Sequence, residues 1–158
     1  MIIAYGTACT MEYLHYHRIV HRNLNPQKFI LDSHLNPFII GFEIKDDDSF
    51  ITTPGYIAPE FIDGVETCRC SNKLDIYSFG ILLFKLITEK DPNQSFGFAA
   101  IANDVLNGKS PEFPDSTLPN WKDLIEKCRS HDHSRMSIAE KSALPTPTMM
   151  MLSGLSDA

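Results

Sequence analysis

The sequence predicts a mainly α-helical domain that contains one short β-hairpin. The strongest observation is the longest apolar stretch of the chain, residues 76–87, whose side chains are apolar on nearly every side of a helix. Other segments carry apolar residues at helical spacing. Between residues 29 and 40, two short apolar runs flank the turn sequence His-Leu-Asn-Pro, which is typical of a hairpin. These observations predict helices packed around one buried central helix.

Length and composition indicate one folded domain followed by a short tail. The chain has 158 residues, of which 43% are hydrophobic, and this is enough to bury a core. We expect the domain to occupy residues 1–144. Residues 145–158 contain Pro, Thr, Met, Ser and Gly without a periodic apolar face, and we predict that they are disordered.

The charge pattern argues against two classes of partner. The formal net charge is -6 and the Lys and Arg residues are not clustered, whereas nucleic acids and anionic membranes require a basic surface. The apolar stretch at residues 76–87 is too short to span a bilayer, and it contains Ser78 and Lys85. The four cysteines show no disulfide framework and no leader sequence opens the chain, so we expect a reducing, cytoplasmic location.

Residues 3–15 are predicted to form the first helix. Its apolar residues recur at helical spacing despite Gly6: Ile3, Ala4, Ala8, Met11 and Leu14. No Ser, Thr, Asp or Asn precedes this pattern as a cap, which indicates that the chain begins inside a longer helix.

A polar loop follows at residues 21–28. Its sequence, His-Arg-Asn-Leu-Asn-Pro-Gln-Lys, lies between two apolar groups, residues 19–20 and residues 29–31. We predict that both groups are short buried strands that fix the ends of the loop, so that the loop displays its side chains for chemistry. Residues 34–37 are predicted to form a turn, and residues 38–40 the returning strand of the hairpin.

The second half of the chain is predicted to be helical. The buried central helix spans residues 75–88, and another helix at residues 98–106 ends at Asn107 and Gly108. A capping box at residues 137–140 opens a last helix, which Pro145 ends. The helix before it presents one apolar face: Trp121, Leu124, Ile125 and Cys128.

Four groups of acidic residues, cysteines and histidines are weak candidates for metal sites. They are residues 46–48, the pair Cys68 and Cys70, the pair His15 and His17, and the pair His131 and His133. Adjacent carboxylates in a loop seldom converge on one ion, and a single Cys-x-Cys lacks a second pair of zinc ligands. We therefore predict a solvated loop at residues 46–48, a loop before a helix at Cys68 and Cys70, polar surface at both histidine pairs, and no metal site.

Four motifs of this chain follow the order and spacing of motifs in the protein kinases, which the chain resembles. Residues 21–28 resemble the catalytic loop His-Arg-Asp-Leu-Lys-Pro-Glu-Asn, and residues 41–43 stand where the family has Asp-Phe-Gly. Residues 53–60 resemble the end of the activation segment in serine/threonine and tyrosine-kinase-like kinases. Residues 75–81 resemble the start of the central helix of the larger lobe. The resemblance implies the mainly α-helical C-terminal lobe of the kinase fold with one short β-hairpin, and an absent N-terminal lobe.

The resemblance also identifies chemical positions that are altered. Asn23 stands where the family has its catalytic base, and Asn25 where it has the lysine that steadies the transferring phosphate. Lys28 replaces a magnesium-binding asparagine and Gly41 replaces the metal-binding aspartate, while Phe42 is retained. An amide accepts no proton near neutral pH, and a fixed positive charge repels Mg²⁺. No catalytic or cofactor-binding position is intact, and we expect neither of the family's cofactors, ATP and Mg²⁺.

The resemblance implies that the internal contacts of the lobe are kept. Glu60 and Arg135 occupy the positions of a buried ion pair, and Asp75 that of an acid that accepts hydrogen bonds from the backbone of the loop at residues 21–28. The positions retained from the family are the following: His21, Arg22, Phe42, Thr53, Ala58, Pro59, Glu60, Asp75 and Arg135.

These features predict a pseudokinase fragment that acts as a binding or scaffolding module in signalling. We expect a protein partner, and self-association through the surface that the missing lobe leaves bare. A first alternative is a divergent ATP-dependent serine/threonine protein kinase, in which another chain supplies the missing lobe and Glu43 or residues 46–48 hold the metal. A second alternative is a truncated product without a selected role.

Lys28 has two interpretations at this stage. In the first, it is a surface lysine whose side chain lies along the loop. In the second, its ammonium group stands in for the lost metal or pairs with Glu43.

Overall fold

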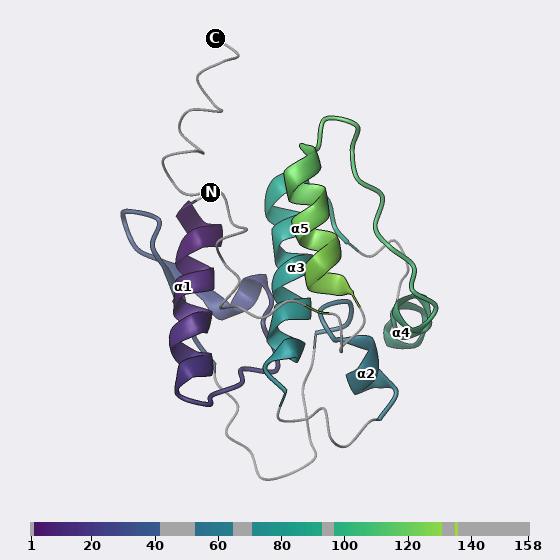
Figure 1. Ribbon diagram of the computed structural model, residues 1–158, viewed down its shortest axis with the longest axis horizontal. Helices are drawn as coiled ribbons and strands as arrows, with labels where there is room; N and C mark the ends of the chain where they lie inside the picture. The colour runs from purple at the N-terminus through teal and green to yellow at the C-terminus, as the bar shows by residue number, and fades with distance from the viewer. Residues whose placement is uncertain (1, 42–52, 65–70, 93–96, 131–134, 136–158) are drawn as a thin grey trace.

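The chain folds into helices and one hairpin. The computed structural model describes residues 2–41, 53–64, 71–92, 97–130 and 135. Its elements are α1 (Ile2–Tyr16), the short 3-10 helix η1 (Pro26–Lys28), β1 (Phe29–Leu31), β2 (Pro37–Ile39), α2 (Pro59–Ile62), α3 (Lys73–Thr88), α4 (Phe98–Leu106) and α5 (Pro119–Arg129). Figure 1 shows α3 between α1 and α5, with the hairpin beside α1. The predicted helical architecture with one hairpin is confirmed.

The central helix α3 is buried, as its apolar pattern predicts. It begins at Lys73, two residues before the predicted start, and it ends at Thr88. Every residue from 74 to 84 is buried, because α1 packs on one side of the helix and α5 on another. Fully burying one Leu, Ile or Phe side chain contributes about 1.5–3 kcal/mol, so this helix is a main source of stability.

Close packing of α3 on α5 explains the glycine in the middle of α3. A Cβ atom at Gly80 would lie 2.6 Å from Cβ of Cys128, closer than two such atoms approach. Burial raises the pKa of the Cys128 thiol to about 12, so this thiol is not a reactive group. The buried face of α5 is the predicted one: Trp121, Leu124, Ile125 and Cys128.

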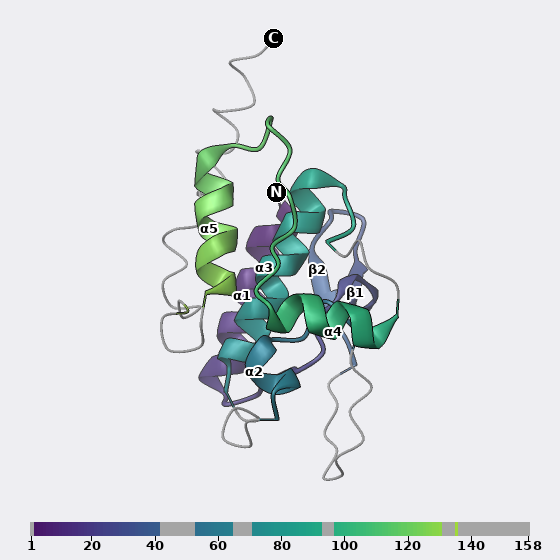
Figure 2. The ribbon, with the colours of Figure 1, turned by 90° about the vertical axis from the view of Figure 1, so that its right-hand side faces the viewer.

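Helix α4 lies at the edge of the lobe and crosses the direction of α3 and α5 (Figure 2). It has the predicted bounds, and Gly108 follows it in a left-handed conformation with φ 69°. None of its residues is buried, and Phe98 and Leu106 are 56% and 48% exposed. The short helix α2, which the sequence analysis did not predict, packs against α4 and carries Pro59 at its first position.

Helix α1 extends one residue beyond the prediction at each end. Gly6 lies where the helix approaches the hairpin, and a Cβ atom there would lie 2.5 Å from Cδ of Pro37. Glycine at this position therefore permits close packing of α1 on β2, although it lowers helix propensity. The buried face of α1 carries Ala4, Thr7, Ala8, Met11 and Leu14.

Residues 19–20 are not a buried strand, so this prediction is wrong. Helix α1 is followed by Arg18 in a left-handed conformation with φ 60°. The N–H of Arg18 donates to the carbonyl of His15 at 3.0 Å, and the N–H of Ile19 donates to the carbonyl of Leu14 at 2.9 Å. These two bonds form a Schellman motif, so the apolar residue that follows Arg18 serves to end the helix. Ile19 itself is 42% exposed.

The hairpin is present, but its first strand is not buried as predicted. β1 pairs with β2 in antiparallel register, with Ile30 opposite Phe38. The returning strand is Pro37–Ile39, one residue earlier than predicted. Side chains alternate across a sheet, so Pro37 and Ile39 are buried while Ile30 and Phe38 are 55% and 56% exposed. The two-stranded sheet thus has one face toward the core and one outer face.

Several predictions concern residues outside the described part of the chain. They are those for Phe42, Glu43, residues 46–48, Cys68, Cys70, His131, His133, the helix opened at residue 137 and the tail at residues 145–158. All of these stay predictions. In the described ranges, no helix is both long enough and apolar enough to cross a bilayer.

Candidate functional site

A buried carboxylate from α3 holds the backbone of the loop at residues 21–28. The N–H of His21 donates to Oδ2 of Asp75 at 2.9 Å, and the N–H of Arg22 donates to Oδ1 at 2.8 Å. Arg22 adopts φ 68°, which is unfavourable for any residue other than glycine. The two bonds therefore fix the loop in a shape that it would not take alone. The acceptor role that the resemblance implies for Asp75 is present in the structure.

A third donor to Asp75 comes from α1 and was not predicted. Nε2 of His15 lies 2.9 Å from Oδ2 of Asp75, and only 4% of the His15 side chain is exposed. The prediction of polar surface at His15 is therefore wrong, although His17 is exposed. A carboxylate offers no proton, so Nε2 of His15 donates this bond. The helical spacing of the sequence could have predicted that His15 is buried, because His15 follows the buried Met11 by about one turn of α1.

The two asparagines of the loop form a hydrogen-bonded triangle with Thr53. Nδ2 of Asn25 donates to Oδ1 of Asn23 at 3.0 Å and to Oγ1 of Thr53 at 2.9 Å. The N–H of Thr53 donates to Oδ1 of Asn23 at 3.3 Å. Asn23 and Asn25 are buried, so these bonds satisfy polar groups that water reaches poorly. Asn25 also caps η1, because its Oδ1 accepts the N–H of Gln27 at 3.0 Å.

This triangle fixes the loop to the segment at Thr53 without providing proton-transfer chemistry. A general base must take up a proton at working pH, and the amide of Asn23 does not. Asn25 is likewise neutral, so it offers no charge to a phosphate group. Their side chains hydrogen-bond to each other and to Thr53, and Oδ1 of Asn25 also accepts the N–H of Gln27.

Lys28 and Gly41 lie against each other at the end of the loop. A Cβ atom at Gly41 would lie 2.9 Å from Nζ of Lys28 and 3.2 Å from its Cδ. The half-buried lysine side chain therefore fills the space that a side chain at position 41 would occupy. The interpretation that Lys28 pairs with Glu43 concerns a residue outside the described ranges and stays a prediction. Nε2 of His21 lies 3.1 Å from the carbonyl oxygen of Ile40, which joins the two ends of this region.

The positions of Lys28 and Gly41 do not fit a magnesium ion. Mg²⁺ prefers hard oxygen ligands in octahedral geometry, whereas these positions supply an ammonium group and no side chain. Among the residues that the structure describes, no three His, Cys, Asp or Glu side chains are grouped so that they could hold a metal ion.

A buried ion pair joins α2 to α3 and to the chain after α5. Nη1 of Arg135 donates to Oε1 of Glu60, and Nη2 donates to Oε2 at 3.1 Å. Nη1 also donates to the carbonyl of Lys73 at 2.9 Å, and Nε donates to the carbonyl of Ser130 at 3.0 Å. The Arg135 side chain is fully buried, and 13% of the Glu60 side chain is exposed. The expected pairing is present, together with two backbone acceptors that the sequence did not indicate.

Arg135 also contacts an aromatic ring of the central helix. Its guanidinium carbon lies 5.1 Å from the centre of the Tyr77 ring. Burial raises the pKa of Tyr77, while the nearby Arg129 and Arg135 act in the opposite direction. Tyr77 is thus an uncharged residue beside two cations, Arg129 and Arg135. These three side chains link α3 to the end of α5.

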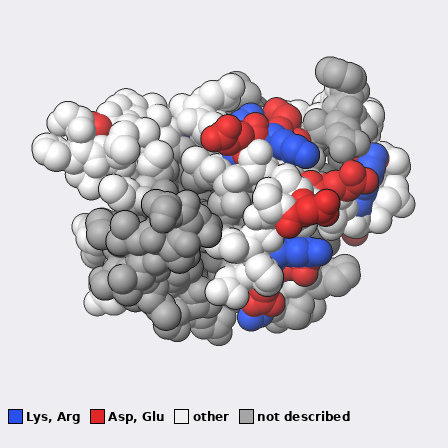
Figure 3. Space-filling view, turned by 90° about the horizontal axis from the view of Figure 1, so that it is seen from above, with Lys and Arg blue, Asp and Glu red and all other residues white. Residues whose placement is uncertain are grey.

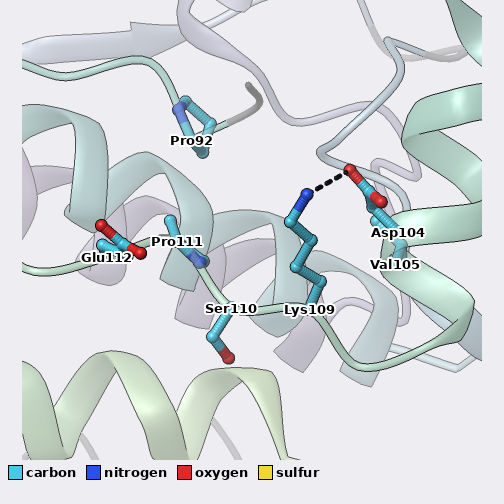
Figure 4. A pocket seen from close by; sticks show the side chains of 7 residues that line it. All are labelled: Pro92, Asp104, Val105, Lys109, Ser110, Pro111 and Glu112. Carbon is cyan, nitrogen blue, oxygen red and sulfur yellow. Dashed lines mark hydrogen bonds and ion pairs between the residues drawn. The ribbon is translucent and has the colours of Figure 1, made fainter. Parts of the chain in front are cut away.

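A separate hollow between α4 and the following segment is small and lies at the surface (Figure 4). It has a volume of about 150 Å³. Lys109 points toward Asp104, with Nζ 3.2 Å from Oδ2, while Glu112 lies at the other end. The two paired side chains are 56% and 29% exposed, and such surface pairs contribute about 0–1 kcal/mol. The hollow includes no residue of the loop at residues 21–28, and it has the character of ordinary polar surface.

The loop, its acceptor on α3 and the buried ion pair define the class of protein. Ala58 is buried and precedes α2, and Pro59 begins this helix, so these two retained motif positions also serve the fold. These features are those of the helical lobe of a protein-kinase-type fold. Its internal contacts surround the loop at residues 21–28.

Comparison with known proteins identifies the family. The family described as protein kinase domain matches residues 2–145. The chain is 33% identical over 147 residues to a protein of Acanthamoeba polyphaga mimivirus that is named as a serine/threonine-protein kinase/receptor. The aligned region is 87% of this chain and 9% of that protein. A probable serine/threonine-protein kinase of Dictyostelium discoideum is 33% identical over 141 residues, 85% of this chain and 10% of that protein. The chain therefore belongs to the protein kinase superfamily and spans about a tenth of the length of these relatives.

Proposed function

We propose that this chain is a pseudokinase lobe, which uses the kinase fold to bind a protein partner and does not transfer phosphate. The observation that carries the proposal is the contact of Lys28 with Gly41. At the place where the family binds its metal, this chain supplies its own fixed positive charge. Asn23 and Asn25 support the proposal, because neither amide moves a proton or carries a charge.

We expect no binding of Mg²⁺-ATP in the micromolar range and no transfer of phosphate to protein. The reason is that the lobe offers no oxygen ligand at position 41 and a cation at position 28. Isothermal titration calorimetry with ATP, in the presence and absence of Mg²⁺, measures the binding. Incorporation of labelled phosphate into a general kinase substrate measures the transfer.

The matched control for this experiment restores both family ligands in the double variant Lys28→Asn, Gly41→Asp. We expect weak Mn²⁺ binding, detected by electron paramagnetic resonance, in the double variant only. Gly41→Asp alone places a carboxylate beside Lys28, so the two side chains form an ion pair instead. Saturable, Mg²⁺-dependent ATP binding by the parent chain, near 1 µM or about 8 kcal/mol, would contradict the proposal.

We further propose that the outer face of the hairpin contacts the protein partner. This hairpin surface consists of Ile30, Leu35, Phe38 and Ile40, which are 55%, 51%, 56% and 40% exposed. Cross-strand pairing places Ile30 directly opposite Phe38. Large apolar side chains exposed together are typical of protein–protein contact surfaces. In the absence of another partner, the same surface is available to a second copy of the chain.

We expect Phe38→Asp to reduce self-association of the chain, because it places a charge in the middle of the hairpin surface. Sedimentation velocity over a range of protein concentrations measures the effect. The parent's mean sedimentation coefficient is expected to rise with concentration, and that of Phe38→Asp to stay constant. The matched control is Phe98→Asp on α4, because Phe98 is also 56% exposed. A parent that stays monomeric at high concentration, or an equal effect of Phe98→Asp, would refute the role of the hairpin surface.

A further inference from the structure

An uncharged groove lies at the end of the molecule where α1 begins, α3 ends and α5 begins. It has a volume of about 540 Å³, and none of its lining residues carries a charge. At its rim, Leu86 and Leu118 are 40% and 57% exposed. The groove thus exposes apolar surface to water. Because burial of apolar surface is favourable, binding of an apolar segment in the groove is favoured. Its apolar walls include Ile3, Leu86, Ile87, Leu118 and Trp121.

Figure 3 views the molecule from this end. Lys, Arg, Asp and Glu side chains gather on the right, whereas the described residues on the upper left are mostly uncharged. A charged segment placed in the groove would lose hydration without gaining an opposite charge from the lining residues. The occupant that complements this groove is therefore uncharged and apolar.

The chain contains a segment with this chemistry. Residues 145–156 read Pro-Thr-Pro-Thr-Met-Met-Met-Leu-Ser-Gly-Leu-Ser and include neither a charged residue nor a histidine. Methionine is unbranched and polarisable, so consecutive methionine side chains adapt to an irregular groove. The segment shows no helical or strand period of its own, which leaves its backbone able to follow the shape of the groove.

The length of chain after Arg135 is sufficient to reach the groove. Arg135 is bonded to the carbonyl of Lys73 at the start of α3, and Thr88 at the other end of α3 lines the groove. The 16 residues of α3 span about 24 Å. Met149 lies 14 residues after Arg135, a reach of about 46 Å when extended. With the predicted helix at residues 137–144, the reach is still about 32 Å.

We propose that residues 149–155 of this chain bind in the groove, with the three methionine side chains against Leu118 and Trp121. Because the segment is tethered to the lobe, its effective concentration is of the order of millimolar, so even a weak contact is populated. The groove lies at the opposite end of α3 from Asp75 and the loop at residues 21–28. Binding there leaves the loop and the hairpin surface accessible.

Methionine oxidation in the full chain tests this proposal. Hydrogen peroxide transfers one oxygen atom to a methionine sulfur and leaves water, and mass spectrometry of peptides follows the rate at Met149, Met150 and Met151. The change is Leu118→Asp, which puts a charge at the rim of the groove. We expect oxidation of the three methionines to be about threefold or more faster than in the parent, because the segment spends more time free. An aspartate at residue 118 also precedes α5 as an N-cap, so the fold is expected to persist.

The matched control is Leu106→Asp, at an apolar residue of α4 that is 48% exposed and lies outside the groove. Its methionine oxidation rates are expected to equal those of the parent. Met11 is fully buried and serves as the internal reference, because its oxidation reports unfolding. Equal oxidation of residues 149–151 in the parent and both variants would overturn the proposal. Protection that disappears on dilution would also overturn it, because a second copy would then supply the segment.

A second measurement tests the same proposal without changing the groove, by changing residues of the tail instead of Leu118. The only tryptophan of the chain, Trp121, lines the groove, so acrylamide quenching of its fluorescence reports water access. We expect stronger quenching in Met150→Asp, Leu152→Asp than in the parent. The control Thr146→Asp, Ser156→Asp adds the same charge at the edges of the segment and is expected to leave quenching unchanged. Equal quenching in all three proteins would count against binding of residues 149–155 in the groove.

Discussion

Replacing Asp75 by alanine is expected to lower the free energy of unfolding by about 3–5 kcal/mol. Asp75 is fully buried and accepts hydrogen bonds from the backbone N–H groups of His21 and Arg22 and from Nε2 of His15. Alanine removes this common acceptor from all three buried or part-buried donors. It also removes the bond that holds Arg22 in its unfavourable conformation. Urea denaturation followed by circular dichroism measures the change.

Two further variants show which property of Asp75 is responsible for the lower free energy of unfolding of Asp75→Ala. Asp75→Asn keeps one oxygen acceptor and nearly the same shape, so we expect a smaller loss than with alanine. Asp115→Ala removes an exposed carboxylate, and we expect a change within about 0.5 kcal/mol. If Asp75→Ala unfolds at the same urea concentration as the parent, Asp75 does not organise the loop.

The second large effect is expected for Glu60→Ala, again about 3–5 kcal/mol of destabilisation. The reason is that Arg135 is fully buried and would keep its charge without the two carboxylate oxygens of Glu60. The carbonyls of Lys73 and Ser130 would remain as acceptors, but they carry no negative charge. Thermal and urea unfolding of parent and variant measure the difference.

The double variant Glu60→Ala, Arg135→Leu shows whether the loss of stability comes from the unpaired charge of Arg135 or from the lost contact with Glu60. We expect it to be more stable than Glu60→Ala alone, because no unpaired cation remains in the interior. Glu126→Ala, at an exposed glutamate of α5, is the matched control and is expected to change stability by less than about 0.5 kcal/mol. A double variant less stable than Glu60→Ala would show that the packing of Arg135 on Tyr77, and not its charge, is decisive.

The sequence predicted features in which one strong local pattern agrees with tertiary packing. The apolar residues of α3 predicted this helix to within two residues of its ends, because burial on several sides leaves few polar positions in the pattern. For α5 the apolar spacing predicted the buried face. The contacts of Asp75 and of Glu60 with Arg135 followed from motif positions, since these residues join segments far apart in the chain. Periodicity alone contains no information on such pairs.

The errors arose where short segments were judged by apolarity alone. Ile19 is apolar, but its backbone ends α1 through the Schellman motif and its side chain stays partly exposed. The pairing of His15 with His17 in the sequence indicates polar surface, whereas the helical spacing places His15 on the buried side of α1. The position of Lys28 over Gly41 was also inaccessible to sequence reasoning, because it depends on where two chain segments cross.

The contact between Lys28 and Gly41 has a consequence for how such a lobe could change over generations. A single replacement of Gly41 by aspartate creates an ion pair with Lys28 rather than a metal ligand, and a residue with a Cβ atom is strained at φ 76°. A single replacement of Lys28 leaves the second ligand missing. Under the proposed function, neither step alone supplies both metal ligands, so selection for catalysis would have no first step to favour. A loss of the ion by this route would be easy to reach by mutation and difficult to reverse.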